Sequence, residues 1–141
     1  MRKKFFALTA LLLLVIMSMG GCADFAFNPI GRWTFVEQRL YTDGTLTDTL
    51  PPEQGHTVSL VFKKSGSGYI DSGTKDTMSF TYEYTDKDVT VTRTQKQDST
   101  KPSVYQVTDN GQKLIYVVDE AELTDEQGNS VHYRVENVFT R

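Results

Sequence analysis

The feature that most constrains the fold of this chain is an alternation of apolar and polar side chains between turn signals. The clearest stretch is 78–85, where Met78, Phe80, Tyr82 and Tyr84 alternate with small polar or charged residues. A period of two places the apolar side chains on one face of a β-strand. Beyond the apolar amino-terminal stretch, helical spacing of apolar residues is brief, and threonine, valine and tyrosine crowd the alternating stretches. The sequence therefore predicts an all-β domain.

The alternating stretches predict eight strands. They are expected at 33–41, 56–62, 69–71, 78–85, 89–94, after Pro102 with Tyr105 and Val107 inward, 113–118 and 131–141. Most connections are short, so consecutive antiparallel strands should lie side by side. Closing the sheet hides the apolar face of every strand and removes the exposed edges. We expect an eight-stranded antiparallel up-and-down barrel, with a two-sheet β-sandwich as the alternative.

The first 21 residues have the pattern of an export signal. A basic head at 2–4 precedes an apolar stretch at 5–17, and small residues follow. The uncharged run is shorter than the roughly 20 residues that a membrane-spanning helix needs. We therefore expect a signal peptide at 1–21, a tether at 22–29 and the folded domain at 30–141.

Met19-Gly20-Gly21-Cys22 resembles the lipobox of bacterial lipoproteins. The resemblance implies cleavage before Cys22, a diacylglyceryl thioether on its sulfur and an acyl chain such as palmitate on the new amino terminus. Several acyl chains together anchor a protein stably in a membrane. The expected location is the bacterial cell envelope, at the outer membrane, on either face. Cys22 is the only cysteine, which excludes an intramolecular disulfide.

The charge of the expected mature chain argues against two classes of partner. Removing 1–21 takes away three basic residues and no acidic one, which leaves a formal charge of −6. No basic cluster is longer than Lys63-Lys64. Nucleic acid and anionic lipid head groups both require positive charge on the protein. We therefore expect neither as a partner of the folded domain.

Gly31-Arg32-Trp33, at the start of the first expected strand, resembles the G-x-W signature of the lipocalins, and Arg141 lies on the last strand. In that family the tryptophan closes one end of the barrel and an arginine packs across its ring. The resemblance implies these closing roles for Gly31, Trp33 and Arg141. It covers about residues 29–141, and the layout is similar to that of short bacterial lipocalin-like lipoproteins. An arginine over an indole contributes about 0.5–2 kcal/mol.

No residue pattern indicates catalysis, a metal site or a cofactor. His56 and His132 lie far apart and have no further ligands at zinc-binding spacing. The acidic stretch 119–126 lacks the order of a calcium loop, so a solvated turn is expected there. We expect no enzyme activity.

Two functions stay open, ahead of an enzyme or enzyme inhibitor. An eight-stranded barrel is either filled by its side chains or holds one small ligand. In the first hypothesis a small apolar or amphipathic molecule binds at the end opposite Trp33, beneath a loop at 42–55. Its expected contacts are Tyr82, Tyr84, Tyr105 and Tyr116, with Tyr84 near the mouth. In the second, the barrel is filled and its loops bind an envelope protein. An open cavity would favour the first, and a closed interior the second.

Overall fold

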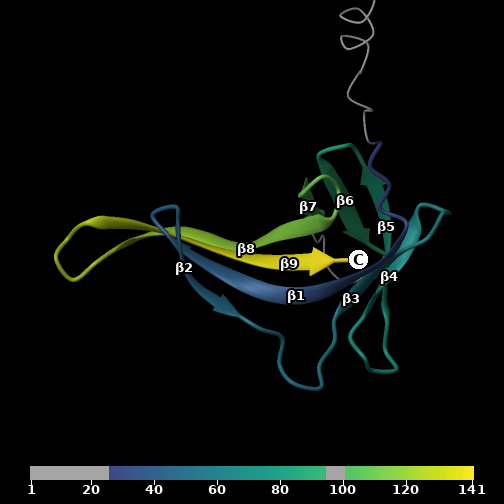
Figure 1. Ribbon diagram of the computed structural model, residues 1–141, viewed down its shortest axis with the longest axis horizontal. Coiled ribbons are helices and arrows are strands. Elements are labelled where there is room, and N and C mark those ends of the chain that lie inside the picture. Colours follow the sequence, from purple (N-terminus) through teal and green to yellow (C-terminus); the bar gives the residue numbers. More distant parts are fainter. Residues whose placement is uncertain (1–25, 95–100) are drawn as a thin grey trace, which may run out of the picture.

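The computed structural model describes residues 26–94 and 101–141, and contains nine strands and no helix in these ranges (Figure 1). The strands are β1 (Gly31–Thr42), β2 (Thr45–Leu50), β3 (Ser59–Phe62), β4 (Ser67–Asp71), β5 (Met78–Tyr84), β6 (Asp88–Arg93), β7 (Ser103–Thr108), β8 (Lys113–Thr124) and β9 (Ser130–Thr140). The expected signal peptide, Cys22 and the first part of the expected tether lie outside the described residues.

Eight of the strands form a closed antiparallel barrel. From β3 to β9 every strand pairs with the next, β1 pairs with β3, and β9 returns to pair with β1. Phe35 lies opposite Phe139 where the first and last strands meet. The predicted eight-stranded up-and-down barrel is therefore confirmed, and because the sheet closes on itself the β-sandwich alternative is wrong.

The ninth strand, β2, occupies a segment predicted to be a loop. Asp43 and Gly44 both have positive φ, at 49° and 77°, as the type I′ turn of a two-residue hairpin requires. The Asp43 carboxylate accepts a hydrogen bond from the backbone of His132, which ties the turn to β9. All six residues of β2 are exposed. The expectation that 42–55 covers the barrel mouth is wrong, because 45–50 extends the sheet sideways instead.

The acidic stretch 119–126 is also mostly strand rather than turn. β8 continues to Thr124 and pairs with β9 over its whole length, around one bulge after Val117. Only the last part of the stretch turns, around Asp125, whose carboxylate accepts hydrogen bonds from Gln127 and Asn129. Acidic residues have a low preference for strands, but here the backbone hydrogen bonds to β9 hold them in one.

The extra strand and the long β8–β9 hairpin together form a sheet that projects from the barrel. We call residues 38–50 and 117–137 the arm. Its strand order is β2-β1-β9-β8, and it extends away from the barrel on the left of Figure 1. β1 begins in the barrel and ends in the arm, so the arm leaves the barrel at the end opposite Trp33.

The barrel interior is filled by side chains. Rings contact each other across it: the centroids of Phe62 and Tyr82 are 4.9 Å apart, and those of Tyr105 and Phe139 are 5.8 Å apart. At Gly68 a side chain would collide with the Phe80 ring and a neighbouring backbone carbonyl, so the wall itself lies against the core. The buried set is Phe27, Trp33, Leu60, Phe62, Phe80, Tyr82, Val89, Val91, Tyr105, Leu114 and Phe139.

Candidate functional site

One end of the barrel is closed around Trp33, whose side chain is completely buried. Its indole nitrogen donates a hydrogen bond to the carbonyl oxygen of Pro29 at 2.7 Å. The guanidinium carbon of Arg141 lies 4.5 Å from the indole ring centroid, and Arg141 also donates to the carbonyl of Gly111. Gly31 has φ +126°, a conformation that side chains disfavour. These contacts join the first strand, the last residue and the β7–β8 turn.

The segment before β1 contributes a plug that the sequence did not indicate. Phe27 falls within the expected tether, yet the residue is only 8% exposed. The ring centroid lies 6.1 Å from that of Trp33 and 6.2 Å from that of Tyr84. The apolar residues around Phe27 form too short a stretch to predict an element, so the sequence does not indicate its burial.

The four tyrosines proposed as ligand contacts do not form one open site. Tyr82 is buried, and its hydroxyl donates to the carbonyl of Lys63 at 2.6 Å. Tyr105 is also buried, and Tyr116 packs against it with a centroid distance of 5.1 Å. Tyr84 is exposed but lies at the Trp33 end, beside Phe27. The expectation that Tyr84 lies near the opposite mouth is therefore wrong, because β5 runs toward the closed end.

The buried tyrosines keep their protons at neutral pH. Burial raises the pKa of Tyr105 to about 12, with Tyr116 adding to the rise and Arg93 opposing it. Burial also raises the pKa of Tyr82, and Tyr84 contributes to that rise. Both phenols are therefore neutral packing groups in the core rather than sources of a phenolate.

A hollow lies at the closed end of the barrel. It is an open depression of about 890 Å³ beside the plug, lined by Phe27, Asp86, Asn110, Gln112 and Arg141 among others. It sits on the opposite side of the core from the mouth at which a ligand site was expected. The filled interior separates the two ends.

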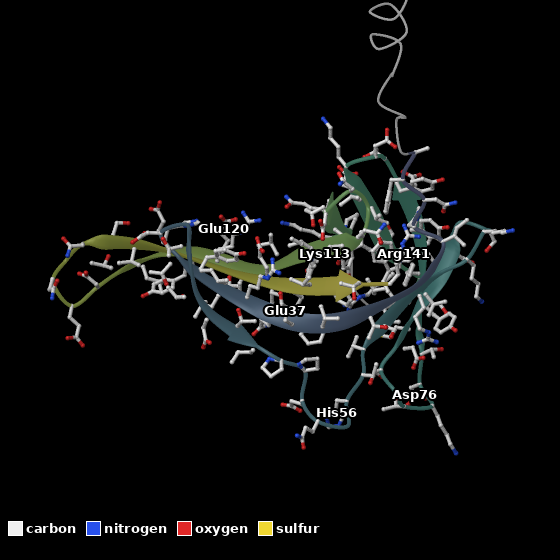
Figure 2. The ribbon with its side chains drawn as sticks, in the orientation of Figure 1. Glu37, His56, Asp76, Lys113, Glu120 and Arg141 are labelled. Carbon is white, nitrogen blue, oxygen red and sulfur yellow. The ribbon has the colours of Figure 1, made fainter. Side chains whose placement is uncertain are left out.

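The arm has two contrasting faces, and one of them is charged. On this face Arg39 donates to Glu37 at 2.6 Å, and Arg134 pairs with Glu136 at 2.8 Å. His132 approaches Glu120 at 3.0 Å. Figure 2 labels Glu120 on the arm, to the left, and Glu37 where β1 passes from the barrel to the arm. These three pairs lie along β1, along β9 and between β8 and β9.

The other face of the arm is apolar, and we call it the apolar face. This face is continuous with the inward face of the barrel. The boundary between the two lies at Gln38 and Asn137, whose side chains form a hydrogen bond of 3.0 Å. Among the described residues, the arm strands make their main contacts with their neighbours in the sheet, and no second layer of strands covers this face. The register of the arm places on it Leu40, Leu50, Ala121, Leu123, Val131, Tyr133 and Val135.

The arm also carries an unequal share of the charge. Its 34 residues, 38–50 and 117–137, together with the adjoining Glu37, contain nine acidic residues but only two arginines and no lysine. The formal charge of this part is therefore −7, against −3 for the whole chain. An apolar, uncovered surface on a strongly acidic sheet is the feature of the molecule most suited to binding.

Comparison with known proteins finds no family model, no curated protein and no solved structure that matches this chain. The described residues contain no helix with the length and apolar character needed to cross a membrane. Within the same ranges, no three histidine, cysteine, aspartate or glutamate side chains gather closely enough to hold a metal ion.

Proposed function

We propose that this protein is a lipid-anchored interaction protein of the bacterial envelope, in which a filled barrel supports the arm as the binding surface for a protein partner. The observation that carries the proposal is the contrast between the two parts. The barrel interior is occupied by packed rings, whereas the apolar side chains of the arm are partly or fully exposed on a face that no described strand covers.

The anchor in this proposal is a lipid on Cys22. Its support is the sequence Met19-Gly20-Gly21-Cys22 after a basic and apolar leader. Phe27, five residues further on, is buried at the barrel end. The anchored cysteine would therefore be joined to the folded domain by a short segment.

Binding of a small molecule inside the barrel has weaker support. Tyr82 and Tyr105 are buried in the core, and Tyr116 packs against Tyr105. A ligand among them would have to displace these rings, which stabilise the fold by their burial. The arm needs no such rearrangement in order to bind.

Photo-crosslinking in living cells of the native host tests the proposal. A photoreactive amino acid is placed at Leu50 or Leu123 on the arm, where the residues are 50% and 54% exposed. Val104 is the matched control, because it is 48% exposed but lies on the outer wall of the barrel. We expect a discrete protein adduct from the two arm positions and none from position 104. Equal adducts from all three positions, or none, would contradict the proposal.

A further inference from the structure

The cross-strand register aligns one row of side chains across the whole width of the arm. Asp48 on β2 lies opposite Leu40 on β1, Leu40 lies opposite Val135 on β9, and Val135 lies opposite Asp119 on β8. Residues directly opposite one another share a face of the sheet. The row therefore has an apolar centre and a carboxylate at each end.

The carboxylates at the two ends are available for an external partner. Asp48 and Asp119 are both exposed, and neither forms an ion pair with another described residue. They differ in this from Glu37 and Glu136 on the charged face, which pair with arginines of the arm itself. Three strand spacings of about 4.8 Å separate the two ends, or about 14 Å.

Toward the tip of the arm the apolar face continues. Tyr133 lies opposite Ala121, and Val131 lies opposite Leu123. From Val135 to the tip of the arm, every β9 side chain on this face is therefore apolar. An occupant of this face would bury these side chains against apolar groups of its own, which is favourable at about 25 cal/mol per Å² of apolar area.

The charge of the arm selects among the possible occupants. A second copy of the chain would bring an arm of the same charge, −7, and place carboxylates against carboxylates. Anionic lipid head groups would be repelled for the same reason. A protein segment with basic residues on either side of an apolar centre has the complementary charge and the complementary apolar surface.

We propose that the apolar face of the arm binds a protein segment whose apolar centre is flanked by lysine or arginine residues. This inference rests on the proposed function and specifies the chemistry of the partner. Asp48 and Asp119 would pair with the basic flanks, while Leu40, Val135 and Leu123 would contact the apolar centre.

The test uses synthetic peptides of defined chemistry. The mature chain is placed in phosphatidylcholine nanodiscs, with empty nanodiscs as the blank, and titrated with a labelled peptide of alternating leucine and lysine. A peptide of alternating leucine and glutamate is the matched probe. We expect the lysine peptide to bind at least ten-fold more tightly, since only it complements the charge of the arm.

Variants of the protein then locate the site. We expect Leu50→Lys and Leu123→Lys each to weaken binding of the lysine peptide about ten-fold or more. Each change places a positive charge on an exposed position of the apolar face, and this charge repels the lysines of the peptide. Val104→Lys, on the barrel wall, should leave binding unchanged. The double change Asp48→Asn with Asp119→Asn should weaken binding several-fold and reduce its salt dependence.

Four outcomes would overturn the inference. The first is binding of the lysine peptide that is insensitive to Leu50→Lys and Leu123→Lys, and the second is equal affinity for the glutamate peptide. The third is a dimer that Leu123→Lys dissociates in sedimentation, which would identify a second copy as the occupant. The fourth is binding to phosphatidylglycerol vesicles that the same change abolishes. Crosslinks from Leu50 and Leu123 in cells would persist in the second case, so a wrong partner chemistry is distinguishable from a wrong function.

Discussion

Arg141 lies over Trp33, with its guanidinium carbon 4.5 Å from the centroid of the indole ring. In the sequence, Trp33 lies near the start of the folded domain and Arg141 lies at its end. Their contact reinforces the pairing of β1 with β9 that closes the barrel. Because Trp33 is the only tryptophan of the chain, its fluorescence reports directly on this contact.

Trp33 and Arg141 should contribute unequally to stability. Trp33→Ala should lower the free energy of unfolding by about 3–5 kcal/mol, as removal of a large core aromatic does. Arg141→Ala should lower it by about 1 kcal/mol, through the lost cation–π contact. It should also shift the emission of Trp33 to longer wavelength as water reaches the ring. Denaturant unfolding and emission spectra measure both effects. Arg93→Ala, an exposed change elsewhere, is the control, and identical emission of the Arg141 and Arg93 variants would contradict the prediction.

The Phe27 plug should stabilise the barrel as a core residue does. Phe27→Ala should lower the free energy of unfolding by about 3 kcal/mol, because it leaves a cavity beside the indole of Trp33. Leu46→Ala, at a position that is 48% exposed, should change it by less than about 0.5 kcal/mol. Denaturant unfolding of the two variants and the wild type makes the comparison. Equal stability of the two variants would show that the plug contributes nothing.

Tyr105 should make the fold sensitive to alkali. Its pKa in the folded protein is raised to about 12, so the folded state holds the phenolic proton more tightly than the unfolded chain does. This contribution is fully present below pH 10 and is lost as the pH rises through 10 to about 12. Two pKa units correspond to roughly 3 kcal/mol. The free energy of unfolding of wild type should therefore fall more steeply over this range than that of Tyr105→Phe. If the free energy of unfolding fell equally steeply with pH in both proteins, the raised pKa of Tyr105 would be refuted.

Cys22 should be essential for membrane attachment. Cys22→Ser removes the thiol that the lipid would modify, so the chain should lose its lipid mass and fail to fractionate with membranes. Mass spectrometry of the processed protein and membrane fractionation provide the measurements. Ser18→Ala, before the lipobox, should be processed normally. A Cys22→Ser chain that is still cleaved and membrane-bound with unchanged mass would rule out the lipid anchor.

The parts of the fold that the sequence predicts are those in which burial imposes a period of two. Phe80 and Tyr82 alternate with exposed residues because one face of β5 is the core, and the strand is correspondingly clear in the sequence. The contact between Trp33 and Arg141 was expected from the resemblance of Gly31-Arg32-Trp33 to a known signature. In these cases local pattern and tertiary packing agree.

Two parts of the arm, β2 and the outer part of β8, could not be predicted in the same way. β2 is exposed at every position, so its sequence is not required to alternate strictly. Asp119 and Glu122 lie in a strand only because β9 pairs with them. Tyr84 has the same period as Phe80, but the period does not reveal which end of the barrel the strand approaches. That direction depends on the closure of the whole sheet.

The burial of Phe27 limits how an anchored molecule can stand on a bilayer. Five residues extend at most about 18 Å, so a lipid on Cys22 would keep the Trp33 end of the barrel close to the head groups. β1 leads from that end to the arm over 12 residues, a path of about 40 Å at roughly 3.3 Å per residue. The barrel would then separate the arm from the membrane, with its Trp33 end always facing the bilayer. Partners embedded at the bilayer surface would meet its closed base, and the arm would be presented to whatever lies further out.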